Sequence, residues 1–318
     1  MRHLFLSLSL FVLLLTSCSA STETPSPQVV IHEVTATAAP QSFRVVAYVT
    51  EAIVDAIIPY EKLTHINYAF LLPNKDGTFD HILDEAKLHT IVEHAHQKDV
   101  KVLISVGGWG WDKQFETVAA DPLLRSVFIH NLKAFVDSFQ LDGVDIDWEY
   151  PDAGASAQNF LALIRDLRAA LPDKEITSAV VAYGENAIGI LSESFKYFDF
   201  VNVMTYDGQD HGTMEQFKKG LSFWRAQGLL QDKIVMGVPF YGDPDLPYRK
   251  IVAADSSAAQ LDSFNYYGTL YHYNGIPTVE AKTRLAMQQA GGIMFWTLDD
   301  DAQGEYSLVN AIYHTLHS

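Results

Sequence analysis

The feature that most constrains the fold is a regular alternation of short apolar β-type runs with amphipathic helical stretches. From residue 43 onward the chain contains eight strand-type runs, which begin at Arg44, His65, Lys101, Gly143, Ile176, Phe200, Ile234 and Gly292. Strands that alternate with helices predict a parallel sheet, and eight such pairs predict a sheet that closes on itself. Residues 43–318 also approach the roughly 250 residues typical of a (β/α)8 TIM barrel. We therefore predict an α/β fold of this type for residues 43–318.

The helical stretches repeat apolar residues at the spacing of an α-helix. They cover residues 84–98, 122–139, 156–171, 213–227, 278–289 and 305–314. Pro122 after Asp121 is a good helix start, because the acid caps the first turn and proline fits there. A doubly wound open sheet is the alternative fold, but no GxGxxG motif follows the first strand run.

The first 42 residues predict export and attachment to a membrane. Residues 4–15 form an apolar run that is too short to span a bilayer comfortably. The sequence Leu-Thr-Ser-Cys at 15–18 resembles the lipobox of bacterial lipoproteins, which implies that Cys18 is lipidated and anchors the protein in the cell envelope. An ordinary secretory signal that ends at Ala20 is the alternative. Residues 1–18 are thus the expected signal peptide, and residues 19–42, rich in Ser, Thr, Pro and Ala, the expected flexible linker.

Composition narrows the class of partner. The formal net charge is −17, which argues against binding to nucleic acid, whose phosphates require a basic surface. An uncharged or cationic ligand is easier to accommodate. The chain has one cysteine, so no disulfide forms within it.

The segment 141–150, LDGVDIDWEY, concentrates acids in a strand-like context. Because side chains alternate along a strand, Asp145, Asp147 and Glu149 point to one face, and their Cα atoms are about 6.5–7 Å apart along the row. The opposite face is apolar and suits packing under helices. Carboxyls this close in a sheltered site cannot all ionise independently, so at least one is expected to hold a proton near neutral pH.

Other chemically useful residues lie at the ends of the predicted strands. In a barrel of this type the active site forms at the C-terminal ends of the strands. Aromatic and acidic residues dominate there: Tyr48, Phe70, 105–111, Asp147, Glu149, Tyr183, 204–207, Tyr241 and Trp296. Aromatic faces stack on sugar rings while carboxyls supply acid catalysis, so this mixture predicts a carbohydrate site.

Together these motifs resemble glycoside hydrolase family 18, the chitinase-like enzymes. DGVDIDWEYP at 142–151 is similar to the DxxDxDxE signature of that family. Supporting motifs in the same order are INYAF at 66–70, SVGG at 105–108, MTYD at 204–207, GVPFYG at 237–242 and the last-strand Trp296. The resemblance covers nearly all of residues 43–318 and implies the (β/α)8 fold and a substrate-assisted glycosidase.

The resemblance also implies roles for the acids. Glu149 would be the general acid that protonates the glycosidic oxygen and later the base toward water. Asp147 would orient the substrate's 2-acetamido group, whose carbonyl oxygen attacks C1 and forms an oxazolinium intermediate. Asp145 would lie beneath Asp147 and share its proton and charge, and Asp142 would support the turn that enters the strand.

Further positions are expected to hold the sugar. By resemblance, Tyr206 would hydrogen-bond the acetamide oxygen, Asp207 would contact the sugar or acetamide region, and Trp296 would form the floor of the subsite where the ring distorts. The remaining predicted substrate contacts are Tyr48, Phe70, Trp109, Met204 and Tyr241. Gly107 and Gly108 are expected to shape the backbone near the site, while Trp109 and Trp111 could equally line subsites or serve packing.

The same residues allow other interpretations. Acids at i, i+2 and i+4 could bind Mg²⁺ or Ca²⁺, but no EF-hand loop and no other evident oxygen ligands are present, so we predict neither a metal nor a cofactor. Trp148 and Trp224 are expected to serve packing. The twelve histidines are expected on the surface, with His211 a weak candidate for a substrate contact.

The sequence therefore predicts a retaining hydrolase of β-1,4 bonds between N-acetylglucosamine units, in chitin or chito-oligosaccharides, that acts as a monomer. The stretch 242–278 is short beside the insertion that deepens the groove in many family members, so we expect a shallow cleft. An endo-β-N-acetylglucosaminidase acting on N-glycan cores is the first alternative. A non-catalytic sugar-binding lectin of the same fold is the second.

Overall fold

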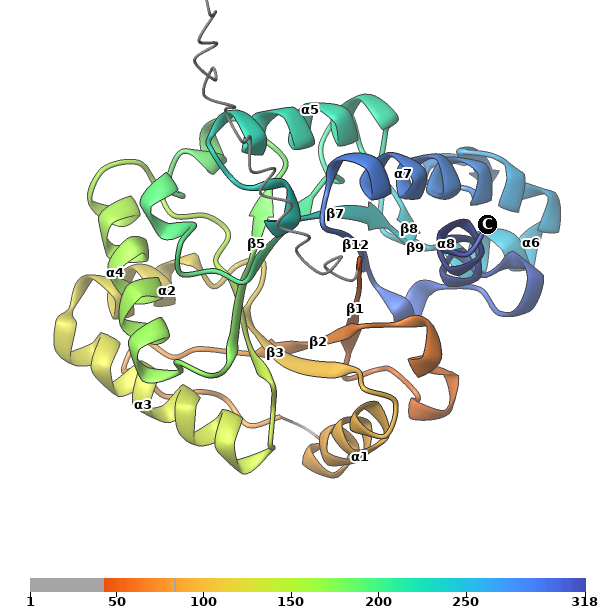
Figure 1. The fold of residues 1–318 in the computed structure, drawn as a ribbon. Helices are drawn as coiled ribbons and strands as arrows, with labels where there is room; N and C mark the ends of the chain where they lie inside the picture. The colour runs from red at the N-terminus through yellow and green to blue at the C-terminus, as the bar shows by residue number, and fades with distance from the viewer. Residues whose placement is uncertain (1–42, 83) are drawn as a thin grey trace, which may run out of the picture. The chain divides into compact units, whose positions relative to one another are not determined.

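The computed structural model describes residues 43–82 and 84–318, and in that part eight parallel strands close into a barrel (Figure 1). Their order around the barrel is β1, β12, β7, β6, β5, β4, β3 and β2. The strands are β1 (Arg44–Thr50), β2 (His65–Leu71), β3 (Lys101–Gly107), β4 (Gly143–Asp147), β5 (Glu175–Val181), β6 (Phe200–Met204), β7 (Ile234–Pro239) and β12 (Gly292–Trp296). The prediction of a (β/α)8 barrel is confirmed, and all eight strand-type runs form its wall. The predicted signal peptide, linker and Cys18 lie outside the described residues.

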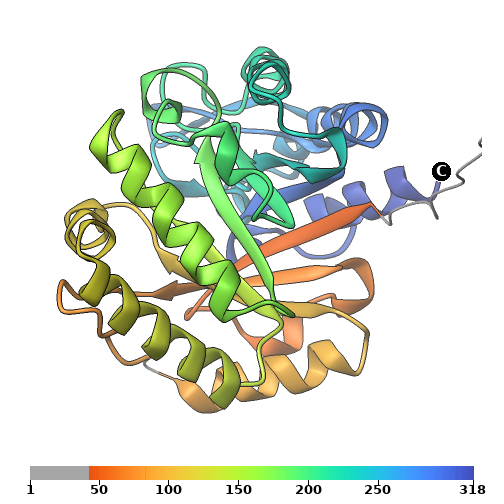
Figure 2. The same cartoon turned by 60° about the vertical axis from the view of Figure 1, so that its left-hand side comes forward.

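Helices surround the strands on the outside (Figures 1 and 2). In the described part they are α1 (Glu85–His96), α2 (Asp112–Ala120), α3 (Pro122–Ser138), α4 (Ala155–Ala170), α5 (Met214–Ala226), α6 (Tyr248–Ala254), α7 (Ile276–Gln289) and α8 (Leu308–Leu316). Asp121 caps α3 as predicted, since its side chain accepts the N–H groups of Leu123 and Leu124. No helix of the described residues is both long and apolar enough to cross a membrane.

The alternation is less regular than the sequence pattern predicted. The β1–β2 and β5–β6 connections contain only 3-10 turns (Asp55–Ile57, Tyr60–Lys62, Glu185–Ala187 and Ser192–Ser194). Pro59 in the first connection and Gly184 and Gly189 in the second interrupt a helical run, because proline lacks the N–H donor and glycine disfavours helix. The β3–β4 and β7–β12 connections each hold two helices instead.

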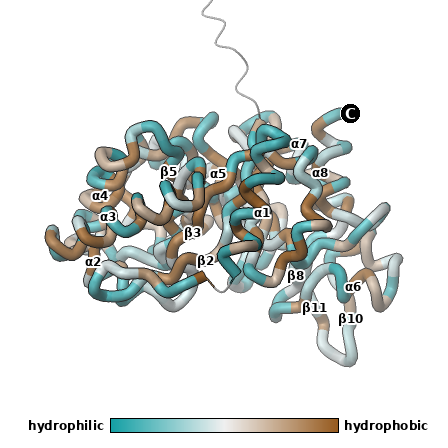
Figure 3. Tube along the Cα trace, turned by 90° about the horizontal axis from the view of Figure 1, so that it is seen from below, coloured by the Kyte–Doolittle hydropathy of each residue, from teal (hydrophilic) through white to brown (hydrophobic). Residues whose placement is uncertain are grey.

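The β7–β12 connection is the longest excursion. It contains two small hairpins, β8 (Tyr241–Gly242) with β9 (Leu246–Pro247) and β10 (Ser263–Tyr266) with β11 (Thr269–His272), and the helix α6. Since the connection leaves β7 at its C-terminal end, these elements belong to the mouth side of the barrel. Figure 3 shows α6, β10 and β11 extending beyond the main body of the barrel.

The residues of strand β4 alternate between the two faces of the barrel wall. Val144 and Ile146 are fully buried in the apolar layer between strands and helices. Asp145 and Asp147 alternate with them and therefore face the barrel interior. Trp148 follows on the apolar side, where its ring stacks on Phe115 with centroids 5.2 Å apart, so its predicted packing role is confirmed.

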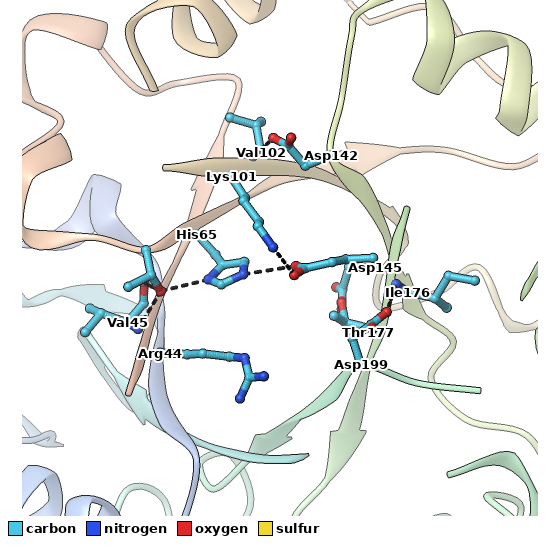
Figure 4. A network of polar contacts seen from close by, with 12 residues as sticks. Arg44, Val45, His65, Lys101, Val102, Asp142, Asp145, Ile176, Thr177 and Asp199 are labelled. Carbon is cyan, nitrogen blue, oxygen red and sulfur yellow. Dashed lines mark hydrogen bonds and ion pairs between the residues drawn. The ribbon is translucent and has the colours of Figure 1, made fainter. Parts of the chain in front are cut away.

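Polar side chains close the opposite end, which we call the base (Figure 4). There His65 and Lys101 both contact the carboxylate of Glu175, and the distance from His65 Nε2 to Glu175 Oε2 is 3.0 Å. Arg44 donates to the carbonyl oxygen of Asp232 and lies over the ring of Phe200. His65 is only 6% exposed, so the expectation that the histidines lie on the surface is wrong for this residue. Its partner Glu175 comes from a strand 110 positions away, which no local pattern reveals.

Candidate active site

A cavity of about 280 Å³ lies at the C-terminal ends of the strands. It brings together residues from seven of the eight barrel strands or the segments that follow them. Its lining consists of Tyr48, Phe70, Gly107, Gly108, Trp109, Trp111, Asp147, Glu149, Ala179, Met204, Tyr206, Asp207 and Trp296. All of the predicted catalytic, substrate-binding and supporting residues except Asp142, Asp145 and Tyr241 therefore meet in one space.

Two carboxyl groups of the β4 segment face this cavity. Asp147 is 3% exposed, and its Oδ1 atom has no hydrogen-bond partner among the described residues. Burial raises the pKa of Asp147 well above its usual value, and the neighbouring Glu149 and Asp145 raise it further. Burial also raises the pKa of Glu149; a hydrogen bond with Tyr150 opposes this shift and Asp207 adds to it. This pair can therefore hold a proton at a pH where an exposed carboxyl has lost it.

Asp145 lies one layer deeper and is fully buried. Its two oxygens accept four hydrogen bonds, with donor distances of 2.6–3.2 Å, from Tyr48 Oη, Ser105 Oγ, Thr177 Oγ1 and Asn202 Nδ2. Burial nevertheless raises the pKa of Asp145, because the four donors only partly offset the lost hydration. These bonds fix the orientation of the carboxyl beneath Asp147. The sharing of a proton between Asp145 and Asp147 stays a prediction.

A tyrosine and acid pair faces the β4 acids from the β6 side. Tyr206 is 6% exposed, and burial raises its pKa well above the usual value, so the hydroxyl remains a donor. Tyr241 donates a short hydrogen bond to Asp207 Oδ1 and lies edge-on to the ring of Tyr206, with centroids 6.3 Å apart. Tyr241 therefore orients Asp207 rather than lining the cavity itself.

Aromatic rings form the apolar part of the cavity. Trp296 stacks on Phe70 with centroids 5.4 Å apart and an interplanar angle of 22°, and it lies 5.6 Å from the ring of Tyr48. Trp109 is 79% exposed at the rim. This exposure excludes packing in the core for Trp109, which lines the cavity at its edge.

The two glycines of the SVGG motif are required by close approach. Gly107 and Gly108 have φ of 110° and 88°, which residues with a Cβ rarely adopt. A Cβ at Gly107 would lie 2.4 Å from the carbonyl oxygen of Asp147, and one at Gly108 would lie 2.8 Å from the Phe70 ring. Gly108 N–H donates to that same Asp147 carbonyl. The motif thus shapes the wall of the cavity next to Asp147, as predicted.

Known proteins show the same combination of barrel and motifs. The family model described as glycosyl hydrolases family 18 matches residues 44–301. The chain belongs to this family. The predictions of a glycoside hydrolase family and of its chitinase-like branch are confirmed at that level.

The chain is also similar to individual chitinases. A chitinase from Bacteroides thetaiotaomicron is 28% identical with a TM-score of 0.78, covering 86% of this chain and 96% of that one. A family 18 chitinase from the chitin utilization locus of Flavobacterium johnsoniae is 30% identical with a TM-score of 0.74, covering 86% and 94%. Chitinase 1 of Aphanocladium album is 23% identical in an alignment 308 positions long, which covers 79% of this chain and 68% of that protein. Matches to two further curated relatives span only 28% and 54% of their lengths.

Asp142 lies at the far end of the family 18 acidic segment, away from the cavity. Its Oδ2 accepts from the N–H of Val102 at 2.7 Å and contacts His96 Nε2 at 2.9 Å. These contacts join the entry of β4 to β3 and α1. The geometry is that of a structural support, in agreement with the role that the family resemblance implies.

The layer beneath the cavity was not predicted from the sequence. Ser105, Thr177 and Asn202 hold Asp145, and Ala179 lines the cavity. A signal existed, because Ser105 and Asn202 each lie two positions before a predicted site residue and so share its face of the strand. His211 was also misjudged, since it is 5% exposed and contacts the backbone of Asp207 rather than the cavity.

A larger hollow of about 490 Å³ lies beside the mouth, between the end of β1 and α6. Its acids are engaged in the fold. Asp299 accepts from the backbone and hydroxyl of Thr50, and Asp301 accepts from the first residues of α8. The smaller cavity is the candidate site, because there two carboxyls with pKa values raised by burial, Asp147 and Glu149, lie beside the stacked ring of Trp296.

Proposed function

We propose that this protein hydrolyses β-1,4 bonds between N-acetylglucosamine units of chitin or chito-oligosaccharides. One observation carries the proposal: Glu149, a carboxyl whose pKa is raised by burial, shares a cavity with Asp147, Tyr206 and the stacked ring of Trp296. A proton donor, a polar group for an acetamide and an apolar floor are the three features that cleavage of an acetamido sugar requires. No lysine, arginine or histidine lines this cavity in the described part of the chain, which suits an uncharged substrate.

In the first step, Glu149 gives its proton to the glycosidic oxygen as the bond to C1 breaks. The carbonyl oxygen of the substrate's own acetamide forms the new bond to C1 and gives an oxazolinium ion. Asp147 stabilises the positive charge of that ion, and the Tyr206 hydroxyl holds the acetamide in position. In the second step Glu149, now ionised, takes a proton from water as the water oxygen attacks C1, the bond from C1 to the acetamide oxygen breaks and the acetamide is restored. Two displacements at C1 retain its configuration.

The test compares chitotetraose with cellotetraose, which carries a hydroxyl in place of the acetamide. We expect cleavage of chitotetraose only, with the β-anomer as the first product in time-resolved proton NMR. Comparable rates on the two sugars would contradict substrate assistance. A first product with α configuration would contradict retention.

An endo-β-N-acetylglucosaminidase acting on N-glycan cores is the second candidate. The β7–β12 excursion favours it, because it adds only two small hairpins and the helix α6 at the mouth, which leave the cleft open to a bulky glycan. Incubation with chito-oligosaccharides and with a high-mannose glycopeptide in parallel decides between the two. Cleavage of the glycopeptide alone would replace our first choice.

A non-catalytic lectin is the third candidate. Proteins that only bind sugar in this fold usually lack the acid, and here Glu149 is present and faces the cavity. A lectin would show no turnover in either the wild type or Glu149→Gln, while both proteins would bind the sugar.

We also propose that the protein is exported, that it is attached to the bacterial envelope through a lipid on Cys18, and that it acts as a monomer. The support for export and attachment is the lipobox-like segment 15–18 and the linker-like composition of 19–42. Labelling with a radioactive fatty acid should mark the wild type and not Cys18→Ser. Sedimentation of a form that begins after Cys18 should give the mass of one chain.

A further inference from the structure

The loop between β6 and α5 presents Tyr206 and Asp207 to the cavity in an unusual conformation. Asp207 has a φ of 63°, in the left-handed region that residues other than glycine seldom adopt. Such a conformation persists only where neighbouring groups hold it. The groups that hold Asp207 therefore decide where its carboxyl points.

His211 is the side chain best placed to do this. Its Nδ1 atom accepts the N–H of Asp207 at 3.0 Å, and its Nε2 atom lies 3.3 Å from the carbonyl oxygen of Tyr241. The two rings meet edge to face, with the His211 and Tyr241 centroids 4.9 Å apart. Since Tyr241 also donates to the Asp207 carboxyl, His211 contacts the backbones of two residues whose side chains are bonded to each other.

We propose that His211, in its neutral form, is a positioning residue that holds Asp207 and Tyr241 together at the sugar site, a role that rests on the proposed function. The two contacts require a bare Nδ1 and a proton on Nε2, because one faces a donor and the other an acceptor. A protonated ring would set a second donor against the Asp207 N–H and break that bond.

The surroundings of His211 favour the neutral ring. The charged groups that face it are Asp207 on its own loop, Asp243 beyond β8 and Lys282 on α7. Burial lowers the pKa of His211 below its usual value, although the bond to the Tyr241 carbonyl and the two acids oppose this shift. The ring thus stays neutral at neutral pH and keeps both contacts.

Other side chains hold the rest of the loop, so a change at His211 acts locally. Gln216 donates to the carbonyl oxygens of Tyr206 at 3.1 Å and Asp207 at 2.9 Å, and it accepts the N–H of Gly212. The buried Lys282 and Asn274 both donate to the Gly212 carbonyl. Of these contacts, only the hydrogen bond from the Asp207 N–H and the contact with the Tyr241 carbonyl oxygen depend on the imidazole of His211.

Two substitutions separate these contacts. In His211→Asn the amide oxygen takes the place of Nδ1 and keeps the acceptor for Asp207, whereas in His211→Gln the amide nitrogen reaches toward Tyr241 and the acceptor is lost. We expect kcat/KM on chitotetraose to fall about 10- to 100-fold in His211→Gln, since a small misplacement near the reacting sugar has effects of that size. In His211→Asn the loss should be about threefold, the effect of one neutral hydrogen bond.

The matched control is His65→Asn at the base. His65 is also buried and makes two polar contacts, with Thr64 and Glu175, but lies away from the cavity. This variant should lower Tm and leave kcat/KM unchanged. Equal losses of kcat/KM in His211→Asn and His211→Gln, or losses that follow Tm in all three variants, would overturn the positioning role.

A second measurement needs no substrate. Nitrogen-15 NMR of labelled histidine, with His211 assigned by its absence in His211→Asn, should show a neutral ring with the proton on Nε2 at pH 7. A charged ring or a proton on Nδ1 would overturn the proposal. If the wild type fails to cleave chitotetraose, a binding measurement tests the positioning role by itself. It compares the affinity of Glu149→Gln for chitotetraose with that of the double variant Glu149→Gln/His211→Gln. A fall in affinity keeps the positioning role and removes only the proposed hydrolysis, and unchanged affinity removes both.

Discussion

The two ends of the barrel hold their carboxyl groups in opposite ways. At the base, Glu175 accepts from His65 and Lys101; burial acts to raise its pKa, but these two partners lower it to about 2. At the mouth, Asp147 and Glu149 have no cation beside them in the cavity, and burial raises the pKa of both. A carboxyl with a cationic partner stabilises the fold, and one without a partner retains a proton for chemistry.

Strand β4 and its flanks contain both situations. Asp142 at its entry is held by His96 and a backbone N–H, and Asp147 at its end has an oxygen without a partner among the described residues. Both residues are aspartates, one directly before β4 and one at its end, so only their surroundings differ. Substitutions at the two ends should therefore have opposite consequences for activity and for stability.

The largest effect is expected from Glu149→Gln, which removes the proposed proton donor and keeps the shape of the side chain. Activity on a chromogenic chitobioside should fall by about 1,000-fold, since general acid catalysis contributes effects of about 10²–10⁴. The free energy of unfolding in urea should not decrease, because an amide is not penalised for burial as a charge is. Retention of more than a tenth of the wild-type rate would remove Glu149 from the acid role.

Asp147→Asn should lower kcat on the same substrate about 100-fold or more, by loss of charge stabilisation at the oxazolinium step. It should also raise Tm at pH 7. The pKa of Asp147 is higher in the folded chain than in the unfolded chain, so the folded state binds the proton more tightly and wild-type stability falls as pH rises above about 4. The gain in Tm should therefore shrink as pH is lowered toward 4. A lower Tm at pH 7 would show that the ionised carboxyl of Asp147 stabilises the fold, as that of Glu175 does at the base.

Glu175→Gln should leave kcat/KM unchanged and lower the free energy of unfolding by about 1–3 kcal/mol, the range for hydrogen bonds to charged groups. Its folded pKa of about 2 lies below the unfolded value of 4.5, so the stabilisation is complete above pH 4.5 and is lost as pH falls toward 2. Urea titrations of wild type and variant should differ at pH 7 and converge near pH 2. A difference that persists at pH 2 would assign the effect to packing instead of charge.

The smallest effect is expected from Asp142→Asn, the matched control for Asp147→Asn in the same acidic segment. The carboxyl is partly exposed and its contact with His96 is a surface one, so the loss of stability should be under about 1 kcal/mol. Activity should equal that of the wild type. A loss of activity comparable to that of Asp147→Asn would break the distinction between the two ends.

Local sequence patterns were sufficient for much of the barrel and for the cavity lining. Strands such as β4 alternate apolar and polar residues with a period of two, and the strand ends then identify Glu149, Tyr206 and Trp296 without any contact information. The connections were harder. Between β1 and β2 the apolar residues around Pro59 resemble helical spacing, but the proline prevents an α-helix.

The amino-acid order by itself determined which residues face the barrel interior, because side-chain direction along a strand follows from the backbone. Only the tertiary structure decided which of those residues meet. Tyr48 bonds to Asp145 across 97 positions, and His211 holds a backbone carbonyl 30 positions away. Tertiary structure also decided the protonation of the carboxyls. Burial and distant partners shift their pKa values in opposite directions at the two ends of the barrel, and neither burial nor these partners can be read from the adjacent residues in the sequence.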